Sequence, residues 1–121
     1  MKDVRKQIGA LGEEVAAQLL EEKGYQVLTR NWRSQLGELD LIVTNQRDLV
    51  FVEVRTTTST RFGYGFQSVD GKKQQQVRKI ALQYVLSHVK RPYSLRFDVV
   101  SVLLNRQTGQ AIETEHFEGA F

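Results

Sequence analysis

Apolar residues recur at helical spacing in two stretches of the chain. The first stripe, in residues 8–23, consists of Ile8, Leu11, Val15 and Leu19. The second, in residues 70–89, consists of Val77, Ile80, Ala81, Tyr84, Val85 and His88. Steps of three and four residues place such side chains on one face of a helix. The pattern predicts two helices, the first ended by Gly24 and the second begun by Asp70 and ended before Pro92.

Shorter stretches with the composition of strands lie between and after these helices. We expect a strand at residues 25–32 and a hairpin around residues 45–48, so that three consecutive strands form a meander. Further strands are expected at residues 95–104 and 111–117. Within the first of these two strands, Asp98 is interpreted as a structural residue. The elements therefore follow the order α-β-β-β-α-β, with one more strand at the end.

The hairpin brings two acidic residues to mirror positions. If it is centred on residues 46–47, Asp40 pairs directly with Glu53. The same register pairs Glu38 with Arg55. Because side chains alternate between the faces of a strand, the core face is expected to be wholly apolar, with Leu39, Leu41, Val43, Val50, Val52 and Val54. The opposite face then carries Asp40, Ile42, Phe51, Glu53 and Arg55.

The opposed acids Asp40 and Glu53 indicate a metal site. Directly opposed carboxylates, with Cβ atoms roughly 4.5–5.5 Å apart, repel one another unless a positive group lies between them. A divalent cation would remove this repulsion. The alternative is a solvated face on which Arg55 neutralises the acids, since surface ion pairs are common and contribute only about 0–1 kcal/mol. Ile42 and Phe51 favour a covered face, where buried charges need partners or a metal.

Composition limits the kinds of site and the location. The 121 residues, 40% hydrophobic and 26% charged, are expected to form a single domain spanning residues 1–121. The absence of cysteine excludes thiolate zinc sites, and His88 and His116 are too far apart in sequence for a recognisable ligand motif, so a bound metal would have oxygen ligands. No stretch approaches the roughly 18 apolar residues of a membrane span. We therefore expect a cytoplasmic protein without membrane contact.

Positive charge is concentrated in residues 61–100. The chain has a net charge of +3, whereas this segment has eight basic residues against Asp70 and Asp98, an excess of +6. Such asymmetry is typical of proteins that bind a polyanion, although a solvated, lysine-rich helix face gives the same signal. The candidate nucleic-acid-binding residues are Arg61, Lys72, Lys73, Arg78 and Lys79. Residues 56–66, with their hydroxyls and three aromatics, form either a loop that contacts nucleic acid or a loop anchored on the core.

Several short strings, in this order and spacing, carry a resemblance to a known family. They are Gly9, Gly12-Glu13, Asn31-Trp32-Arg33, Gly37-Glu38-Leu39-Asp40-Leu41-Ile42, Phe51-Val52-Glu53-Val54, Phe62-Gly63, Lys73-Gln74 and Arg96-Phe97-Asp98-Val99-Val100. On these strings the whole chain resembles the YraN-like family of small bacterial proteins of predicted endonuclease type, related to Holliday-junction resolvases. The element order, with acids on the second and third strands, likewise resembles the restriction-endonuclease-like fold and its PD-(D/E)XK active site. The resemblance implies an α/β fold whose mixed sheet is flanked by helices.

The resemblance also implies roles for individual residues. Asp40 and Glu53 would be metal ligands, and the backbone carbonyl of Val54 would complete the coordination of Mg²⁺ or Mn²⁺. Glu13 would be an accessory acid, although an acid on a helix is by default solvent-facing. Gln74 would orient a water or a phosphate, and the preceding lysine would add charge, unless both simply mark an exposed helix start.

Arg55 departs from the family pattern, which has lysine at this position. Arginine stays charged, so it can hold a phosphate or stabilise negative charge but cannot deprotonate a water. The leading hypothesis is a Mg²⁺-dependent, structure-selective DNA endonuclease acting in repair or recombination on branched or structured DNA, with a homodimer as one allowed assembly. The alternative is a catalytically weak or inactive nucleic-acid-binding protein of the same fold. A third hypothesis, an interaction protein without a nucleic-acid role, requires the acidic face to be merely solvated.

Overall fold

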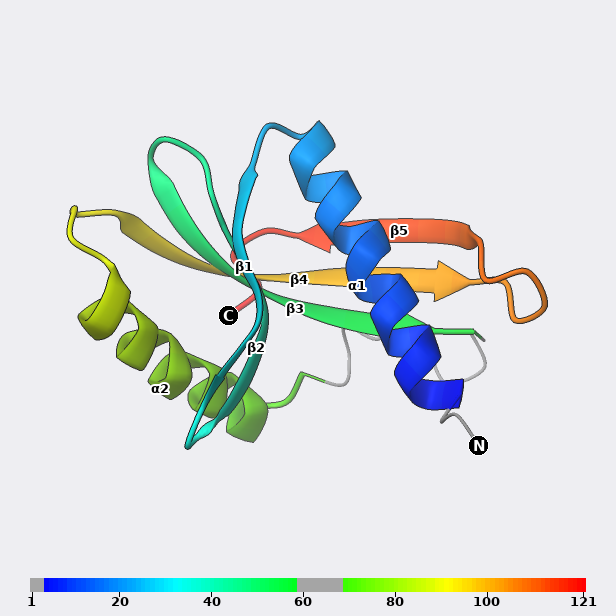
Figure 1. The fold of residues 1–121 in the computed structure, drawn as a ribbon, viewed down its shortest axis with the longest axis horizontal. Coiled ribbons are helices and arrows are strands. Elements are labelled where there is room, and N and C mark those ends of the chain that lie inside the picture. Colours follow the sequence, from blue (N-terminus) through cyan, green and yellow to red (C-terminus); the bar gives the residue numbers. More distant parts are fainter. Residues whose placement is uncertain (1–3, 59–68) are drawn as a thin grey trace.

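The computed structural model describes residues 4–58 and 69–121, which form one sheet between two helices (Figure 1). The elements of the described residues are α1 (Val4–Glu22), β1 (Gln26–Ser34), β2 (Gly37–Thr44), β3 (Asp48–Thr57), α2 (Gly71–His88), β4 (Ser94–Leu104) and β5 (Ala111–Phe117). The strands lie in the sheet in their chain order. β3 and β4 are parallel, and the other neighbours are antiparallel. The predicted element order and the mixed sheet are therefore confirmed.

Helix α1 begins four residues before the predicted start, at Val4. Gly24, with a φ of +96°, ends the helix in the left-handed conformation that glycine adopts without steric cost. The amide of Tyr25 then donates to the carbonyl of Leu20 at 3.0 Å, which satisfies one of the last carbonyls of the helix. The predicted end of this helix is confirmed.

The buried face of α1 differs from the predicted stripe. Its buried residues are Gly12, Ala16, Ala17 and Leu20. Of the predicted apolar stripe, Leu11 is 45% exposed, whereas Ile8, Val15 and Leu19 are partly buried against the core. Small residues bring the helix backbone close to the sheet, so that a Cβ on Gly12 would overlap the side chain of Thr56. Close backbone approach therefore decides which face is buried, and it fixes the position of the neighbouring Glu13.

The β2–β3 hairpin has the predicted register. Its pairs run from Thr44 with Leu49 to Leu41 with Val52, so its centre lies between residues 46 and 47. Most side chains of the hairpin lie on the faces that alternation predicts. The cluster against α1 includes Leu41, Val43, Val50, Val52 and Val54, whereas the cluster against α2 includes Ile42, Leu49 and Phe51. Both faces of the hairpin are thus covered, and the merely solvated acidic face is excluded.

Three details at the start of β2 correct the prediction. The ladder ends at the pair of Leu41 with Val52, so the predicted direct pairing of Asp40 with Glu53 is not formed. Leu39 packs in the cluster against α2, not on the α1 face. Glu38 pairs with Arg33 of β1 and forms an ion pair with it at 3.2 Å, so its predicted pairing with Arg55 was wrong. The two pairings differ because the β2–β3 ladder ends at Leu41, and the earlier residues of β2 pair with β1 alone.

Helix α2 connects the parallel strands β3 and β4. Its predicted cap is confirmed, because Asp70 Oδ1 accepts a hydrogen bond from the amide of Lys73 at 2.9 Å. β4 follows β3 along its full length, with Glu53 opposite Val99. This crossover brings the first turn of α2 toward the middle of β3. In the described part of the chain, neither helix is long and apolar enough to cross a membrane.

Candidate active site

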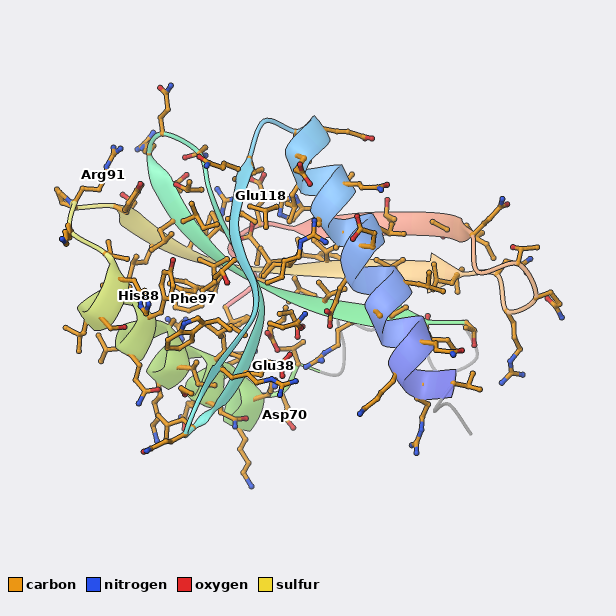
Figure 2. All side chains as sticks on the ribbon, viewed as in Figure 1. Glu38, Asp70, His88, Arg91, Phe97 and Glu118 are labelled. Carbon is orange, nitrogen blue, oxygen red and sulfur yellow. The ribbon has the colours of Figure 1, made fainter. Side chains whose placement is uncertain are left out.

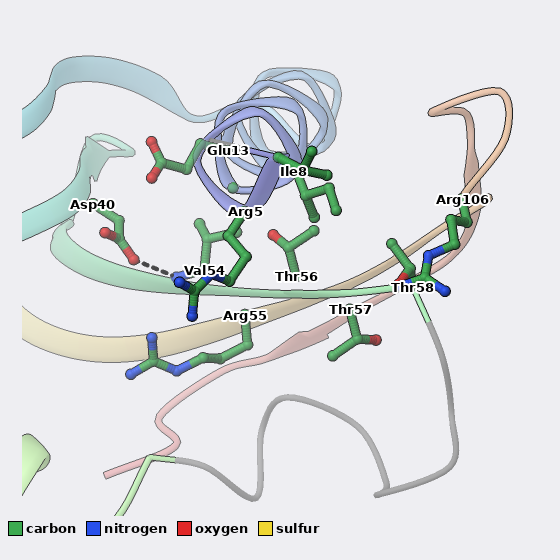
Figure 3. A pocket seen from close by; sticks show the side chains of 12 residues that line it. Arg5, Ile8, Glu13, Asp40, Val54, Arg55, Thr56, Thr57, Thr58 and Arg106 are labelled. Atoms are coloured by element: carbon green, nitrogen blue, oxygen red, sulfur yellow. Dashed lines mark hydrogen bonds between the residues drawn. The ribbon is translucent and has the colours of Figure 1, made fainter. Parts of the chain in front are cut away.

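A cleft of about 690 Å³ opens between α1, the end of β3 and the β4–β5 loop. It is lined by Glu13 from α1, Asp40 from β2, and Val54 and Arg55 from β3, with Arg106 contributed by the loop (Figure 3). Four residues that the sequence singled out, from three separate elements, therefore line the same cavity.

Asp40 lies where the β2–β3 ladder ends. Its Oδ2 accepts a hydrogen bond from the amide of Val54 at 2.8 Å, the dashed line in Figure 3. Burial raises the pKa of Asp40, although this hydrogen bond and the positive charges of Arg55 and Lys73 oppose the rise. The carboxylate is thus held at the cleft by one of its oxygens, in an environment that disfavours its charge.

Glu53, whose charge interacts with that of Asp40, is 1% exposed and is not among the residues that line the cleft. Its Oε1 lies 3.5 Å from Nζ of Lys73 and 3.8 Å from Nη2 of Arg55. Burial and the negative charge of Asp40 raise the pKa of Glu53 to about 7, despite the opposing effect of these two cations. Two positive groups at these distances therefore do not compensate for the loss of water around the carboxylate.

Two buried side-chain atoms of the described residues have no hydrogen-bond partner, and both belong to this site. They are Oε2 of Glu53 and Nε of Arg55. Buried polar atoms are nearly always paired, and leaving one unpaired costs about 1–3 kcal/mol. An unpaired carboxylate oxygen suits a cation, and an unpaired guanidinium N–H suits an anion such as a phosphate oxygen.

The donor atoms fit a hard divalent cation. In residues 4–58 and 69–121, no group of three or more His, Cys, Asp and Glu side chains is placed to hold a metal ion. A cation here would therefore have at most two such side chains from these residues as ligands. The carboxylates of Asp40 and Glu53, whose charges interact, are the candidates, with the carbonyl of Val54 and water as further ligands. Magnesium sites commonly have this composition, one or two carboxylates and several waters.

Asn31 belongs to the site, and sequence reasoning did not assign it a role. With its amide nitrogen facing the acids, it donates to Glu13 Oε2 at 3.0 Å and to Glu38 Oε1 at 2.7 Å. Its φ of +51° is left-handed, a conformation that asparagine adopts more readily than most residues. Partial burial and the charge of Asp40 raise the pKa of Glu13, and the Asn31 hydrogen bond opposes this rise. The sequence signal was the membership of Asn31 in the string that carried the family resemblance.

The two predicted residues at the start of α2 differ in their contacts. Lys73 reaches the site through its ion pair with Glu53. Gln74 donates from Nε2 to the carbonyl of Val69 at 3.1 Å, which holds the segment that leads into the helix. A contact between Gln74 and a substrate therefore stays a prediction.

The predicted nucleic-acid-binding residues that the structure describes make different contacts. Lys72 and Lys79 line a second cavity of about 430 Å³ beside α2. The guanidinium of Arg78 lies 4.7 Å from the ring centre of Phe97. Arg61 lies outside the described residues. Nucleic-acid binding by these side chains stays a prediction.

The remaining positive charge of residues 61–100 is spread over the molecule. Arg91 lies just after the C-terminal end of α2, far from Asp70 at its N-terminal end (Figure 2). Its guanidinium donates a hydrogen bond to the carbonyl of Gln46 at 2.9 Å. Arg96 is bound in an ion-pair network with Asp98 at 2.8 Å. Several of the positive charges in residues 61–100 are therefore used in contacts within the protein, and the net charge of this segment is not a measure of one basic surface patch.

Arg96, Asp98 and His116 form a second buried charge cluster, the Asp98 cluster. The carboxylate of Asp98 is 0% exposed. It accepts hydrogen bonds from Arg96 Nε at 2.9 Å, His116 Nε2 at 2.7 Å and the amide of Gly119 at 2.9 Å. Burial raises the pKa of Asp98, but the hydrogen bonds from His116, Arg96 and Gly119 outweigh it and lower the pKa to about 2. These contacts support the structural interpretation of Asp98.

The fold and the cleft define a three-layer α/β protein with a buried acidic site. The model of Uncharacterised protein family UPF0102 matches residues 12–102, and the chain belongs to this family. It is 46% identical over 121 residues to a UPF0102 protein of Pelotomaculum thermopropionicum, with both chains covered completely. It is 42% identical over 122 residues to a relative from Caldanaerobacter subterraneus subsp. tengcongensis, again with 100% of both chains covered. The family membership indicated by the sequence strings is thereby confirmed, and the matched residues include Glu13, Asp40 and Glu53.

Proposed function

We propose that this protein is a Mg²⁺-dependent, structure-selective endonuclease that hydrolyses phosphodiester bonds in DNA. One observation carries the proposal: two acids, Asp40 and Glu53, lie together with raised pKa values, and Glu53 Oε2 is buried without a partner. Burying carboxylates in this way destabilises a fold unless a cation joins them. Strongly perturbed carboxyl groups at a cleft are a mark of functional sites.

The element order supports the proposal. The chain has the element order expected of a restriction-endonuclease-like core. A helix is followed by a three-stranded meander, a second helix and a strand, β4, that runs parallel to β3. The acids lie on the second and third strands, as that resemblance requires. Asp40 would correspond to the first acid of the PD-(D/E)XK pattern, and residues 53–55 to its (D/E)XK part.

The side chains of the acidic site would have distinct roles in this chemistry. Asp40, Glu53 and the carbonyl of Val54 would hold the cation. When bound, Mg²⁺ would offset the charge that develops on the phosphate and polarise the attacking water. Arg55 would donate from its unpaired Nε to a phosphate oxygen.

The proton of the attacking water needs an acceptor other than Arg55. Glu13 faces the cleft, and its raised pKa makes its carboxylate a stronger base than an ordinary glutamate. The hydrogen bond from Asn31 fixes this carboxylate in place. Lys73 would keep positive charge beside Glu53 throughout the reaction.

Arg55 also favours a second candidate function, a nucleic-acid-binding protein that does not cleave. A lysine at this position can lose its proton when buried, whereas an arginine cannot. If cleavage in this fold required a neutral amine at residue 55, this protein would bind DNA through the same cleft without cutting it.

A cleavage panel separates the two candidates. Purified protein is assayed with Mg²⁺ or Mn²⁺ on branched, flapped, single-stranded and duplex DNA and on RNA. We expect cleavage of a branched or flapped DNA, its elimination in Asp40→Asn, and cleavage by Arg55→Lys within about tenfold of the parent, roughly 1.4 kcal/mol in barrier. Arg55→Ala, which removes the positive charge altogether, should impair cleavage further.

The opposite results are equally informative. Cleavage that appears in Arg55→Lys but is absent from the parent would show that arginine is an inactivating replacement, and the binding function would hold. If the parent and Arg55→Lys both bind DNA and metal yet cut nothing in the panel, the enzyme proposal is wrong.

A further inference from the structure

The cleft continues past the acids along the end of β3. Figure 3 shows Glu13 and Asp40 at one end of the cleft and Arg106 at the other, with Thr56 and Thr57 between them. Thr58, the next residue, lines the same cavity. The acidic end is the site described above, whereas this second half has no part in holding the cation.

The second half of the cleft is lined by groups that bind phosphate. Thr56 and Thr58, on the same face of the strand, supply two hydroxyls, and Arg106 supplies a guanidinium group (Figure 3). Hydroxyls and guanidinium groups are common donors to phosphate oxygens, and such contacts hold the backbone of a nucleic acid without reading its sequence. None of the described residues that line the cleft has an aromatic ring on which a base could stack. The lining therefore fits a phosphodiester backbone.

The size of the cleft limits the form of nucleic acid that can enter. A volume of about 690 Å³ falls in the range of small-molecule pockets, roughly 300–1,000 Å³. A duplex is far wider, since its major groove alone measures about 12 Å, so it could touch only the rim. Asp40, however, lines the cleft, and a phosphate reaches its carboxylate only if the neighbouring nucleotides also enter the cleft.

We infer that the cleft takes a single DNA strand, with a phosphate next to the scissile one bound by Arg106 and by the hydroxyls of Thr56 and Thr58. The identity of the scissile phosphate rests on the proposed function, whereas the binding of the strand does not require cleavage. In a branched DNA, the strand in the cleft belongs to a flap, a gap or an unpaired arm. Paired arms lie outside the cleft.

The test measures binding without cleavage. The affinities for a fluorescent single-stranded oligonucleotide and for the matching blunt duplex are measured by anisotropy in EDTA. The parent is expected to bind the single strand more tightly. Arg106→Ala should weaken binding of the strand about threefold to tenfold and lower the slope of its salt dependence by about 0.7, the value for one phosphate contact to a single strand. Thr58→Val, a nearly isosteric change, should weaken binding about twofold to fivefold.

Arg47→Ala is the matched control, because it removes the same charge in the β2–β3 turn, outside the cleft. It should change the affinity by less than about twofold. Equal binding of strand and duplex by the parent, or equal effects of Arg106→Ala and Arg47→Ala, would overturn the assignment of the cleft. Strand-selective binding that depends on Arg106, in a protein that cuts nothing with Mg²⁺ or Mn²⁺, would uphold the cleft assignment and refute the nuclease. Cleavage by a protein that binds strand and duplex equally would uphold the nuclease and refute the cleft assignment.

Discussion

The acids of the cleft and the Asp98 cluster both bury carboxylates against the same sheet, but their partners differ. Asp98 accepts hydrogen bonds from a guanidinium, an imidazole and a backbone amide, and its pKa falls to about 2. Glu53 has cations at 3.5 Å and 3.8 Å and one oxygen without a partner, and its pKa rises to about 7.

This difference in partners distinguishes the structural Asp98 cluster from the proposed metal-binding site. In the Asp98 cluster the carboxylate is satisfied by the protein itself, so folding favours its charged form. At the candidate site the protein leaves one buried oxygen of Glu53 without a partner, which favours a ligand that supplies positive charge. Glu53 and Asp98 are both buried, but their pKa values shift in opposite directions.

Asp98→Asn is expected to have the largest effect on stability. It leaves Arg96 and His116 without their charged partner, and breaking a buried ion pair costs about 3–5 kcal/mol. Urea unfolding at neutral pH measures the loss. Glu118→Gln is the matched control, because Glu118 lies 3.9 Å from Arg96 but is 53% exposed, and its loss should stay below about 1 kcal/mol. Equally small losses in both variants would contradict the structural role of the Asp98 cluster.

Glu53→Gln is expected to stabilise the metal-free protein above pH 7. The pKa of Glu53 is about 7 in the folded protein and 4.5 ordinarily, so protonation favours the folded state. This contribution is fully present below pH 4.5 and is lost as the pH rises through 7. The loss is at most about 3 kcal/mol, and glutamine avoids it. Urea unfolding in EDTA across this range should show the gain growing with pH.

Asp98 provides the opposite pH dependence in the same experiment. Its pKa is about 2 in the folded protein and 3.8 ordinarily, so its contribution is present above pH 3.8 and is lost as the pH falls through 2. The two clusters should therefore produce slopes of opposite sign in separate pH windows. A Glu53→Gln variant less stable than the parent above pH 7 would show that the protein itself satisfies this carboxylate.

Gly12→Ala is expected to cost about 1–3 kcal/mol, because the added Cβ overlaps Thr56 and forces α1 away from β3. In an uncrowded helix the same change stabilises by about 0.5–1 kcal/mol. Gly9, on the same helix, has nothing within 4 Å of an added Cβ, so Gly9→Ala is the matched control and should stabilise. Thermal unfolding of the two variants should give shifts of opposite sign. Shifts of the same sign would mean that close packing at Gly12 does not fix the position of Glu13.

The elements that the sequence predicts well have strong local signals. The β2–β3 register follows from alternation around the turn at residues 45–48. The bounds of α2 follow from its cap at Asp70 and from Pro92, which cannot continue a helix. Alternation together with the position of the turn is also sufficient to predict that Asp40 and Glu53 lie close together on neighbouring strands.

The features that the sequence does not predict depend on contacts between distant segments. Leu11 looked buried because it is large and apolar, but the neighbouring small residues decide how α1 packs. Asn31 lies in a strand whose sequence carries no sign of a left-handed residue, and its partners come from α1 and β2. Arg106 reaches the cleft from the β4–β5 loop, which nothing in its local sequence indicates.

The central claim, that Asp40 and Glu53 bind one divalent cation between them, is tested most directly by calorimetric titration of the metal-free protein with Mn²⁺. We predict that the parent and the Glu118→Gln control bind the ion, and that Asp40→Asn and Glu53→Gln each abolish binding because each removes a carboxylate ligand. Binding that persists unchanged in both cleft variants would contradict the claim.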